Sequence, residues 1–182
     1  MRNSYNNYSW SFLIASPAFS DGFFEETAVL VLEDNENGSF GVIINKPTSE
    51  TLAEMNPSFA GTPLESIEVF DGGPLAKDKI NLAACSRNGK SEGVFSFGIP
   101  PEQAEEILRA DADAKIMAYA GYSGWGENQL QNEINEGTWL VSNADIATVL
   151  DIDCDEVWKS LALRECPEYR LLEKPSGDPE LN

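Results

Sequence analysis

Two apolar runs rich in β-branched residues, at positions 27–33 and 39–45, flank a polar segment that ends in Asn37-Gly38. An Asn-Gly pair readily adopts the positive φ angles of the tight turns that join antiparallel strands. Pro47 is expected to end the second strand, because proline has no N–H group to donate to a neighbouring strand. The pattern therefore predicts a β-hairpin, and any fold proposed for this chain must contain an antiparallel sheet.

Shorter apolar runs, and segments with apolar residues at helical spacing, predict the other elements. The expected strands cover residues 12–15, 67–70, 80–85, 93–97, 114–120 and 138–141. The expected helices lie at 51–55 and 144–150, after Pro100, around Leu130 and Ile134, and after Asp153. Asn88-Gly89 predicts a second hairpin turn, and Ser142 or Asn143 is expected to cap the helix at 144–150. The mixture of strands and helices places the chain in the α/β (α+β) class.

At 182 residues the chain is long enough for one domain with a hydrophobic core. We expect residues 1–166 to form this domain, with residues 1–10 as a frayed lead-in, and residues 167–182 to form a mostly disordered acidic tail. The apolar segment at positions 10–19 is interrupted by Pro17 and makes a weak signal peptide. No apolar run approaches the roughly 18 residues that a membrane-spanning helix needs, so no membrane association is expected.

The three cysteines, Cys85, Cys154 and Cys166, form no close pair and no Cys-x-x-Cys motif. An odd number of widely spaced cysteines argues against a disulfide framework and against a zinc site. The pattern indicates a reducing compartment, and the predicted location is cytoplasmic.

The charge balance is strongly acidic, with 31 acidic and 12 basic residues and a net charge of −19. Binding to duplex DNA draws much of its affinity from Lys and Arg side chains that neutralise phosphates, so direct nucleic-acid binding is disfavoured. An acidic surface also opposes anionic membranes and attracts basic partners. Simple solvation of the surface explains the same charge without any partner.

The chain contains no histidine. This absence removes the Ser-His-Asp and Cys-His catalytic arrangements, the histidine-based zinc sites and the commonest general base near neutral pH. An enzyme built on this sequence would depend on carboxylates, a lysine or backbone dipoles.

Two short patterns resemble ligand-binding motifs, and each has a simpler explanation. Residues 84–91 fit a loose phosphate-binding pattern, but Ser91 precedes a predicted strand, whereas a phosphate-binding loop leads into a helix. Asp151, Asp153 and Asp155 alternate like calcium ligands, but the glycine that a calcium loop needs is missing. We therefore interpret the first pattern as a hairpin turn and Asp153 as a helix cap.

A serine nucleophile activated by Lys46 is a third arrangement that the residue types allow. Ser16, Ser20 and Ser123 lie in predicted loops that contain glycine or proline. Nothing in their spacing pairs one of them with Lys46, so we assign no catalytic residue.

Residues 119–126 combine glycines with aromatic side chains and lead into a short predicted helix. We expect a loop here, in which Gly121, Gly124 and Gly126 enclose Tyr122 and Trp125. Glycine lets a backbone approach a ligand or another chain closely, and aromatic rings supply apolar area. A packed turn of the core is the alternative. Trp125 is accordingly either a cover over the core or an exposed anchor of an interface.

Two further segments complete a candidate surface for a ligand or partner. The Asp71-Gly72-Gly73-Pro74 segment either presents N–H groups to a ligand or forms a tight turn, and Lys46 follows a buried strand. The full candidate surface consists of Lys46, Gly72, Gly73, Gly121, Tyr122, Ser123, Gly124, Trp125 and Gly126.

Six segments occur in an order that resembles one family. They read FLIASP at 12–17, NGSFGVIINKP at 37–47, VFDGGPL at 69–75, YAGYSGWGENQLQNEI at 119–134, TWL at 138–140 and LDIDCDEVW at 150–158. Together they resemble the AlgH/YqgE family of bacterial proteins, from about Phe12 to Leu163. The resemblance implies a branched mixed sheet that curls into a pseudo-barrel with helices packed outside.

The resemblance also implies a cytosolic protein without an established activity, although members are often labelled transcriptional regulators. It brings no catalytic residues and no cofactor. Many members carry one histidine where Asp34 stands and another near Ala83. Both are absent here, so this chain could not perform any histidine chemistry of the family. Ser123 and Asn128 replace a more usual alanine and glycine.

These observations predict a non-enzymatic cytosolic module that acts in regulation or protein interaction. We expect no cofactor and no metal, and a protein partner that remains to be identified, with a small molecule as the second class of partner. One alternative is a transcriptional regulator that binds DNA directly, which the net charge of −19 disfavours. The other is a small-ligand binder or enzyme with a glycine-rich pocket.

Overall fold

The computed structural model of the chain describes residues 6–18, 22–87 and 93–171. The predicted hairpin is confirmed, because β2 (Ala28–Asn35) and β3 (Gly38–Ile43) pair antiparallel across a short turn. Gly38 has a φ of 139°, and a Cβ atom there would lie 2.4 Å from the carbonyl oxygen of Trp125 on the adjacent strand. The hairpin therefore depends on Gly38 for its turn and for its close pairing with the rest of the sheet.

Strand β8 (Lys115–Gly126) is the centre of the sheet, and it changes neighbours along its length. Its first half pairs in parallel with β5 (Glu68–Asp71) and antiparallel with β6 (Leu75–Ser86). Its second half pairs antiparallel with β3. The sheet is therefore branched at β8, as the family resemblance implied.

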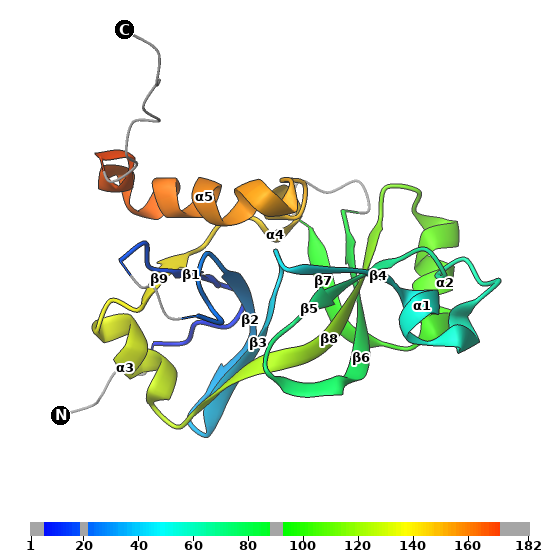
Figure 1. Ribbon diagram of the computed structural model, residues 1–182, viewed down its shortest axis with the longest axis horizontal. Helices are drawn as coiled ribbons and strands as arrows, with labels where there is room; N and C mark the ends of the chain where they lie inside the picture. The colour runs from blue at the N-terminus through cyan, green and yellow to red at the C-terminus, as the bar shows by residue number, and fades with distance from the viewer. Residues whose placement is uncertain (1–5, 19–21, 88–92, 172–182) are drawn as a thin grey trace, which may run out of the picture.

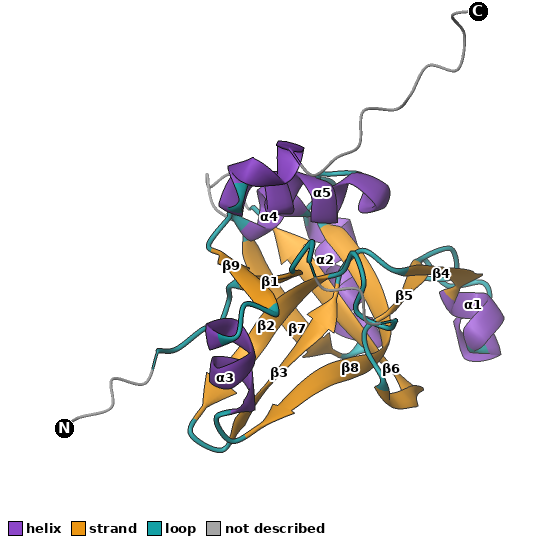
Figure 2. Ribbon diagram, turned by 60° about the vertical axis from the view of Figure 1, so that its left-hand side comes forward, coloured by secondary structure: helices purple, strands orange, loops and turns teal. Residues whose placement is uncertain are grey.

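Four more strands extend the branched sheet to nine. Beyond the hairpin follow β1 (Phe12–Ala15) and β9 (Trp139–Ser142), while β4 (Pro47–Thr51) pairs with β5 and β7 (Val94–Ile99) pairs with β6. The strands curl into a half-barrel, and the helices lie outside it (Figures 1 and 2). The expected fold class is confirmed.

The helices pack on the outside of this half-barrel. They are α1 (Leu52–Met55), α2 (Pro101–Ala110), α3 (Gln129–Asn135), α4 (Ile146–Val149) and α5 (Cys154–Glu165), with 3-10 turns η1 (Pro57–Phe59) and η2 (Pro167–Leu171). Helix α5 contacts β1 and β9, α4 contacts β6 and β7, and α2 contacts β6 and β8 (Figure 1). No helix within the described ranges is long and apolar enough to cross a membrane.

Strand β8 also separates two hydrophobic cores, because alternate side chains of a strand point to opposite faces. Met117 and Tyr119 belong to the larger core, which includes the hairpin, β1, β9 and α5. Ile116 and Ala118 belong to the smaller core, which includes residues of α1 and α2. The position of β8 between the cores explains why residues 114–120 carry little charge.

Three local expectations are wrong in whole or in part. Residues 121–126 are not a loop but the continuation of β8, since their glycines suit a strand that β3 approaches closely. The second strand does end before Pro47, at Ile43, but Pro47 then starts the edge strand β4, where its missing N–H costs nothing. Helix α4 is capped by Asp145, whose carboxylate accepts from the N–H of Thr148 at 2.9 Å, rather than by Ser142 or Asn143.

Other expectations fall partly outside the described residues. The turn at Asn88-Gly89 does so, but its flanking strands β6 and β7 pair antiparallel, and a strand rather than a helix follows. That order removes the basis for a phosphate-binding loop. Of the expected tail, residues 167–171 form η2, in which the Tyr169 ring packs 5.5 Å from that of Trp158, and residues 172–182 are not described.

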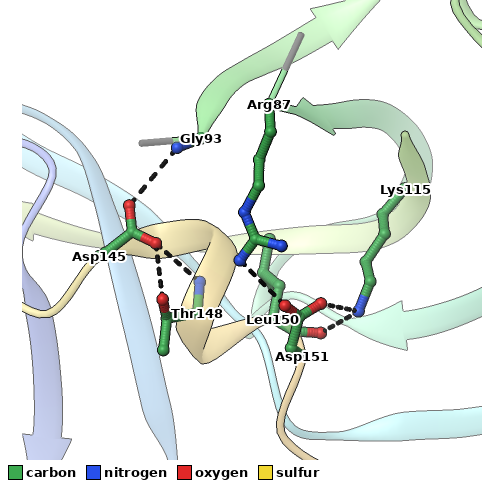
Figure 3. A network of polar contacts seen from close by, with 7 residues as sticks. All are labelled: Arg87, Gly93, Lys115, Asp145, Thr148, Leu150 and Asp151. Carbon is green, nitrogen blue, oxygen red and sulfur yellow. Dashed lines mark hydrogen bonds and ion pairs between the residues drawn. The ribbon is translucent and has the colours of Figure 1, made fainter. Parts of the chain in front are cut away.

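Two carboxylates anchor α4 to the ends of three strands (Figure 3). Asp145 accepts from the N–H and the hydroxyl of Thr148 at 2.9 and 2.8 Å, and from the N–H of Gly93, before β7, at 3.4 Å. Asp151 forms ion pairs with Arg87, after β6, at 2.9 Å and with Lys115, at the start of β8, at 2.8 Å. Hydrogen bonds from Thr148 lower the pKa of Asp145, and those from Lys115 and Arg87 lower the pKa of Asp151.

A lowered carboxyl pKa makes this anchor sensitive to acid. Such a group stabilises the fold above its unfolded pKa of about 3.9 and loses that contribution as the pH falls through its folded pKa. We expect Asp145→Ala to lower the free energy of unfolding by about 1 kcal/mol at pH 7, as is typical for loss of a helix cap. Urea unfolding should show this difference shrinking below about pH 4.

Asp153→Ala is the matched control, because Asp153 is the N-cap of α5 but makes no side-chain capping bond. Its effect on urea unfolding at pH 7 should be clearly smaller. Equal losses in the two variants would contradict the proposed anchor.

Candidate functional site

Three glycines bring the segment that follows β5 into direct contact with the backbone of β8. Gly72 and Gly73 follow β5, and they cross β8 at Gly121. A Cβ atom would lie 2.4 Å from the Gly121 oxygen if placed on Gly72, and 2.3 Å from the carbonyl carbon of Tyr122 if placed on Gly73. Only glycine permits this approach. We call these three residues the glycine crossing.

Backbone hydrogen bonds hold the glycine crossing together. The N–H of Gly72 donates to the oxygen of Ala120 at 2.9 Å, and its own carbonyl oxygen accepts from the N–H of Ile43 at 3.0 Å. The Ser123 hydroxyl donates to the same oxygen at 3.3 Å. Gly72 therefore joins β5, β8 and the end of β3 at one point.

The crossing forces β6 away from β8. Leu75 pairs with Tyr122 and Ile80 with Ala120, so residues 76–79 of β6 lie opposite Gly121 alone. Ala76 takes a φ of 50°, which is rare for a residue with a side chain. We call residues 76–79 the β6 bulge.

The β6 bulge forms one wall of a groove of about 480 Å³. The groove is lined by Ala76 and Lys79 of the bulge, and by Phe40, Asn81, Phe97 and Tyr122. The Phe40 ring lies 6.2 Å from that of Tyr122 and 6.5 Å from that of Phe97, in edge-on and tilted contacts. All three rings are half-buried, so each presents part of its surface to the groove. We call this feature the aromatic groove.

Three polar side chains in the aromatic groove have no partner within the described part of the chain. They are the Lys79 ammonium group, the Asn81 amide and the Tyr122 hydroxyl, whereas Lys77 of the same bulge pairs with Asp71 at 2.8 Å. Free polar groups beside apolar rings are typical of ligand pockets, where a few polar groups orient a mostly apolar ligand.

Lys46 lies beside the glycine crossing but is engaged with Phe23. Its ammonium group donates to the Phe23 carbonyl oxygen and lies 5.0 Å from the ring centroid, and the Lys77 ammonium group lies at the same distance from that ring. Burial lowers the pKa of Lys46, and the nearby Asp71 opposes this shift. The hydroxyl of Ser123 bonds to Gly72 rather than to Lys46.

Comparison with known proteins identifies the family and the fold. The model of the AlgH-like family matches residues 12–170. The chain belongs to the AlgH-like family. It is 30% identical to a UPF0301 protein of Streptomyces avermitilis and 30% identical to UPF0301 protein SCO2948 of Streptomyces coelicolor, with 93% of this chain and 93% of the relative covered in each case.

Two solved structures share the fold of this AlgH-like chain. The solution structure of AlgH from Pseudomonas aeruginosa has a TM-score of 0.67 and 26% identity, covering 97% of this chain and 98% of that one. The crystal structure of DIP2367 from Corynebacterium diphtheriae has a TM-score of 0.70 and 19% identity, covering 94% of both chains. The branched half-barrel is therefore an architecture that experiment has observed.

In this AlgH-like chain the candidate surface divides into buried and exposed parts. Trp125 is 7% exposed, and its indole N–H donates to Glu133 of α3 at 2.8 Å. The Trp139 indole N–H donates to the same carboxylate oxygen at 2.8 Å, and the two rings meet edge-on at 6.0 Å. Trp125 thus covers the core and holds α3, and of the two aromatic residues only Tyr122 reaches the aromatic groove.

The remaining members of the candidate surface serve the backbone. Ser123 is fully buried, and Gly72, Gly73 and Gly121 form the crossing. Gly124 and Gly126 are exposed, and the N–H of Gly126 donates to the side-chain oxygen of Gln129 at 3.0 Å. Within the described ranges, no three Cys, Asp or Glu side chains gather as metal ligands, and Asp151 is occupied by its two cations.

Five groove residues were not predicted from the sequence, namely Phe40, Ala76, Lys79, Asn81 and Phe97. The alternation of Phe95 and Phe97 in a short strand was a usable signal, because residues two apart share a face. Phe95 belongs to the larger core, and Phe97 packs against it. The sequence holds no comparable signal for the contact between Phe97 and Phe40.

The glycine crossing can be tested against a glycine with the same backbone angle. Gly121 has a φ of 76° and Gly137 a φ of 78°, but a Cβ on Gly121 would lie 2.6 Å from the Gly73 oxygen, whereas one on Gly137 would meet nothing within 4 Å. We expect Gly137→Ala to cost about 1 kcal/mol of unfolding free energy from φ strain alone. Gly121→Ala should cost roughly 3 kcal/mol or more, because backbone must also move.

Guanidinium unfolding of both variants provides the measurement. A loss in Gly121→Ala no larger than that in Gly137→Ala would show that close backbone contact at the crossing does not matter.

Proposed function

We propose that this chain is a non-enzymatic cytoplasmic regulatory module that works by binding, and that the aromatic groove is its ligand site. One observation supports this proposal above others. Three half-buried rings, from Phe40, Phe97 and Tyr122, share a groove of about 480 Å³ with three polar groups that lack partners in the described ranges. Ligand pockets in proteins commonly have this composition and a volume of about 300–1,000 Å³.

The chemistry of the lining suggests the class of ligand. Edges and faces of the three rings favour a flat, apolar ring that can stack against them. The Lys79 ammonium group supplies positive charge at the rim, and the Asn81 amide and Tyr122 hydroxyl supply neutral donors. A small planar molecule that carries one anionic group satisfies both features.

Binding is favoured over catalysis because the candidate catalytic side chains near the groove already make hydrogen bonds to the backbone. The chain has no histidine, and the ammonium group of Lys46 donates to a backbone carbonyl. Ser123, the serine nearest the crossing in sequence, is buried and donates to Gly72. A general base or activated nucleophile would need a free partner at these positions.

The regulatory part of the proposal requires a protein partner that responds to the ligand. A net charge of −19 favours a partner with a basic surface, because long-range attraction raises the rate of encounter. The same charge opposes direct binding to DNA, whose phosphates need neutralising cations. We therefore rank a protein-directed regulator above a DNA-binding one.

A pair of matched fluorescent probes tests the groove. 1-Anilinonaphthalene-8-sulfonate carries an anionic group, and N-phenyl-1-naphthylamine has the same rings without it. We expect both probes to bind one per chain. Lys79→Met should weaken the sulfonate probe about threefold, the size of an exposed ion pair, and leave the neutral probe unchanged. Tyr122→Ala should weaken both probes about tenfold or more.

Lys159→Met makes the same charge change on α5 and serves as the control, with both affinities expected to match the native chain. Urea unfolding of each variant checks that the fold is retained. Non-saturating fluorescence, or equal effects of the Lys79 and Lys159 changes, would rule out the groove as the site.

A further inference from the structure

A second cavity lies on the other side of Tyr119, between the sheet and the helices α4 and α5. Its volume is about 240 Å³. The lining comes from the end of β3, from β5 and β8, and from α4 and α5, and most of it is aliphatic or aromatic. Ile116, Met117, Val149 and Val157 of this lining are each at most 8% exposed, so the floor of the cavity lies deep in the fold.

A polar residue in the lining of this cavity makes only a weak hydrogen bond. Tyr119 is 1% exposed and lines the cavity, and its hydroxyl donates to the Met117 sulfur at 3.6 Å. Within the described ranges this thioether is its only partner, and sulfur is a weak acceptor. A buried hydroxyl normally finds an oxygen or nitrogen partner, so Tyr119 retains the capacity to donate to a ligand.

The cavity carries no charge that would select an ion. Lys115 lies at its rim, but its ammonium group is committed to the Leu150 carbonyl oxygen at 2.6 Å and to Asp151 at 2.8 Å. Burial raises the pKa of Tyr119 and of the Cys154 thiol, so both remain neutral near pH 7. A charged ligand would lose its hydration without compensation here.

We propose that this cavity binds a small neutral, mainly apolar molecule with one hydrogen-bond acceptor, and that the Tyr119 hydroxyl donates to that acceptor. An apolar cavity of about 150 Å³ in another protein accommodates benzene, so the present volume suits a molecule of about nine or ten non-hydrogen atoms. Entry is past Phe70, Leu150, Ile152 and Cys154, the half-buried members of the lining. The site is separate from the aromatic groove and does not depend on the function proposed for it.

Two isosteric probes separate the hydrogen bond from simple burial. Acetophenone has a carbonyl oxygen where α-methylstyrene has a methylene group. Titration of each probe is followed through the methyl NMR signals of Met117, Val149 and Val157, which line the cavity. We expect saturable shifts of these signals with both probes, and tighter binding of acetophenone.

Tyr119→Phe should weaken acetophenone about fivefold, as expected for loss of one hydrogen bond, and leave α-methylstyrene unchanged. Cys154→Phe, which fills the cavity from its edge, should abolish binding of both probes. Cys166→Phe is the matched control, because Cys166 lies outside the lining and should leave both affinities unchanged.

Absence of shifts at these methyl groups with either probe would overturn the proposal. So would an equal effect of Tyr119→Phe on both probes, a result that does not depend on whether Cys154→Phe folds. Lys79→Met and Tyr122→Ala should not alter these affinities. Failure of the cavity and failure of the aromatic groove are therefore separately visible.

Discussion

Direct backbone contact between Gly73 and Gly121 is the constraint on which the architecture depends. It allows the segment after β5 to cross β8, and it lets Gly72 bond to both β8 and β3. One strand can then pair with three neighbours, which branches the sheet. At the crossing, regular pairing between β6 and β8 is interrupted, and residues 76–79 form the β6 bulge. This bulge is one wall of the aromatic groove.

The Tyr119 ring lies between the two proposed sites, the aromatic groove and the cavity beneath α4 and α5. It lies 6.3 Å from the ring of Phe97 in the aromatic groove and 5.9 Å from that of Phe70 in the cavity. Tyr119 lines only the cavity and Phe97 lines only the aromatic groove, so packed aromatic rings separate the two sites.

Local chemistry accounts for what the sequence could predict. The hairpin depends on Asn37-Gly38 and its flanking residues, and the strand over residues 114–120 follows from its composition. The continuation of β8 through residue 126 was misread because glycines suit both loops and close strand pairing. The groove was missed because Phe40, Phe97 and Tyr122 come from separate strands, and a register shift opposite Gly121 brings them together.

The pairing of β1 with β9 affects how the chain folds during its synthesis. Strand β1 is fully buried, yet Phe12 pairs with Ser142, and the Trp158 indole N–H reaches the Ala15 carbonyl at 2.8 Å. A growing chain must therefore wait for more than a hundred residues before one edge of its first strand is covered. Long-range closure of this kind slows folding and leaves apolar surface open to aggregation. Strand β2 can cover one edge of β1 early, but the edge that later pairs with β9 stays open until most of the chain has been made.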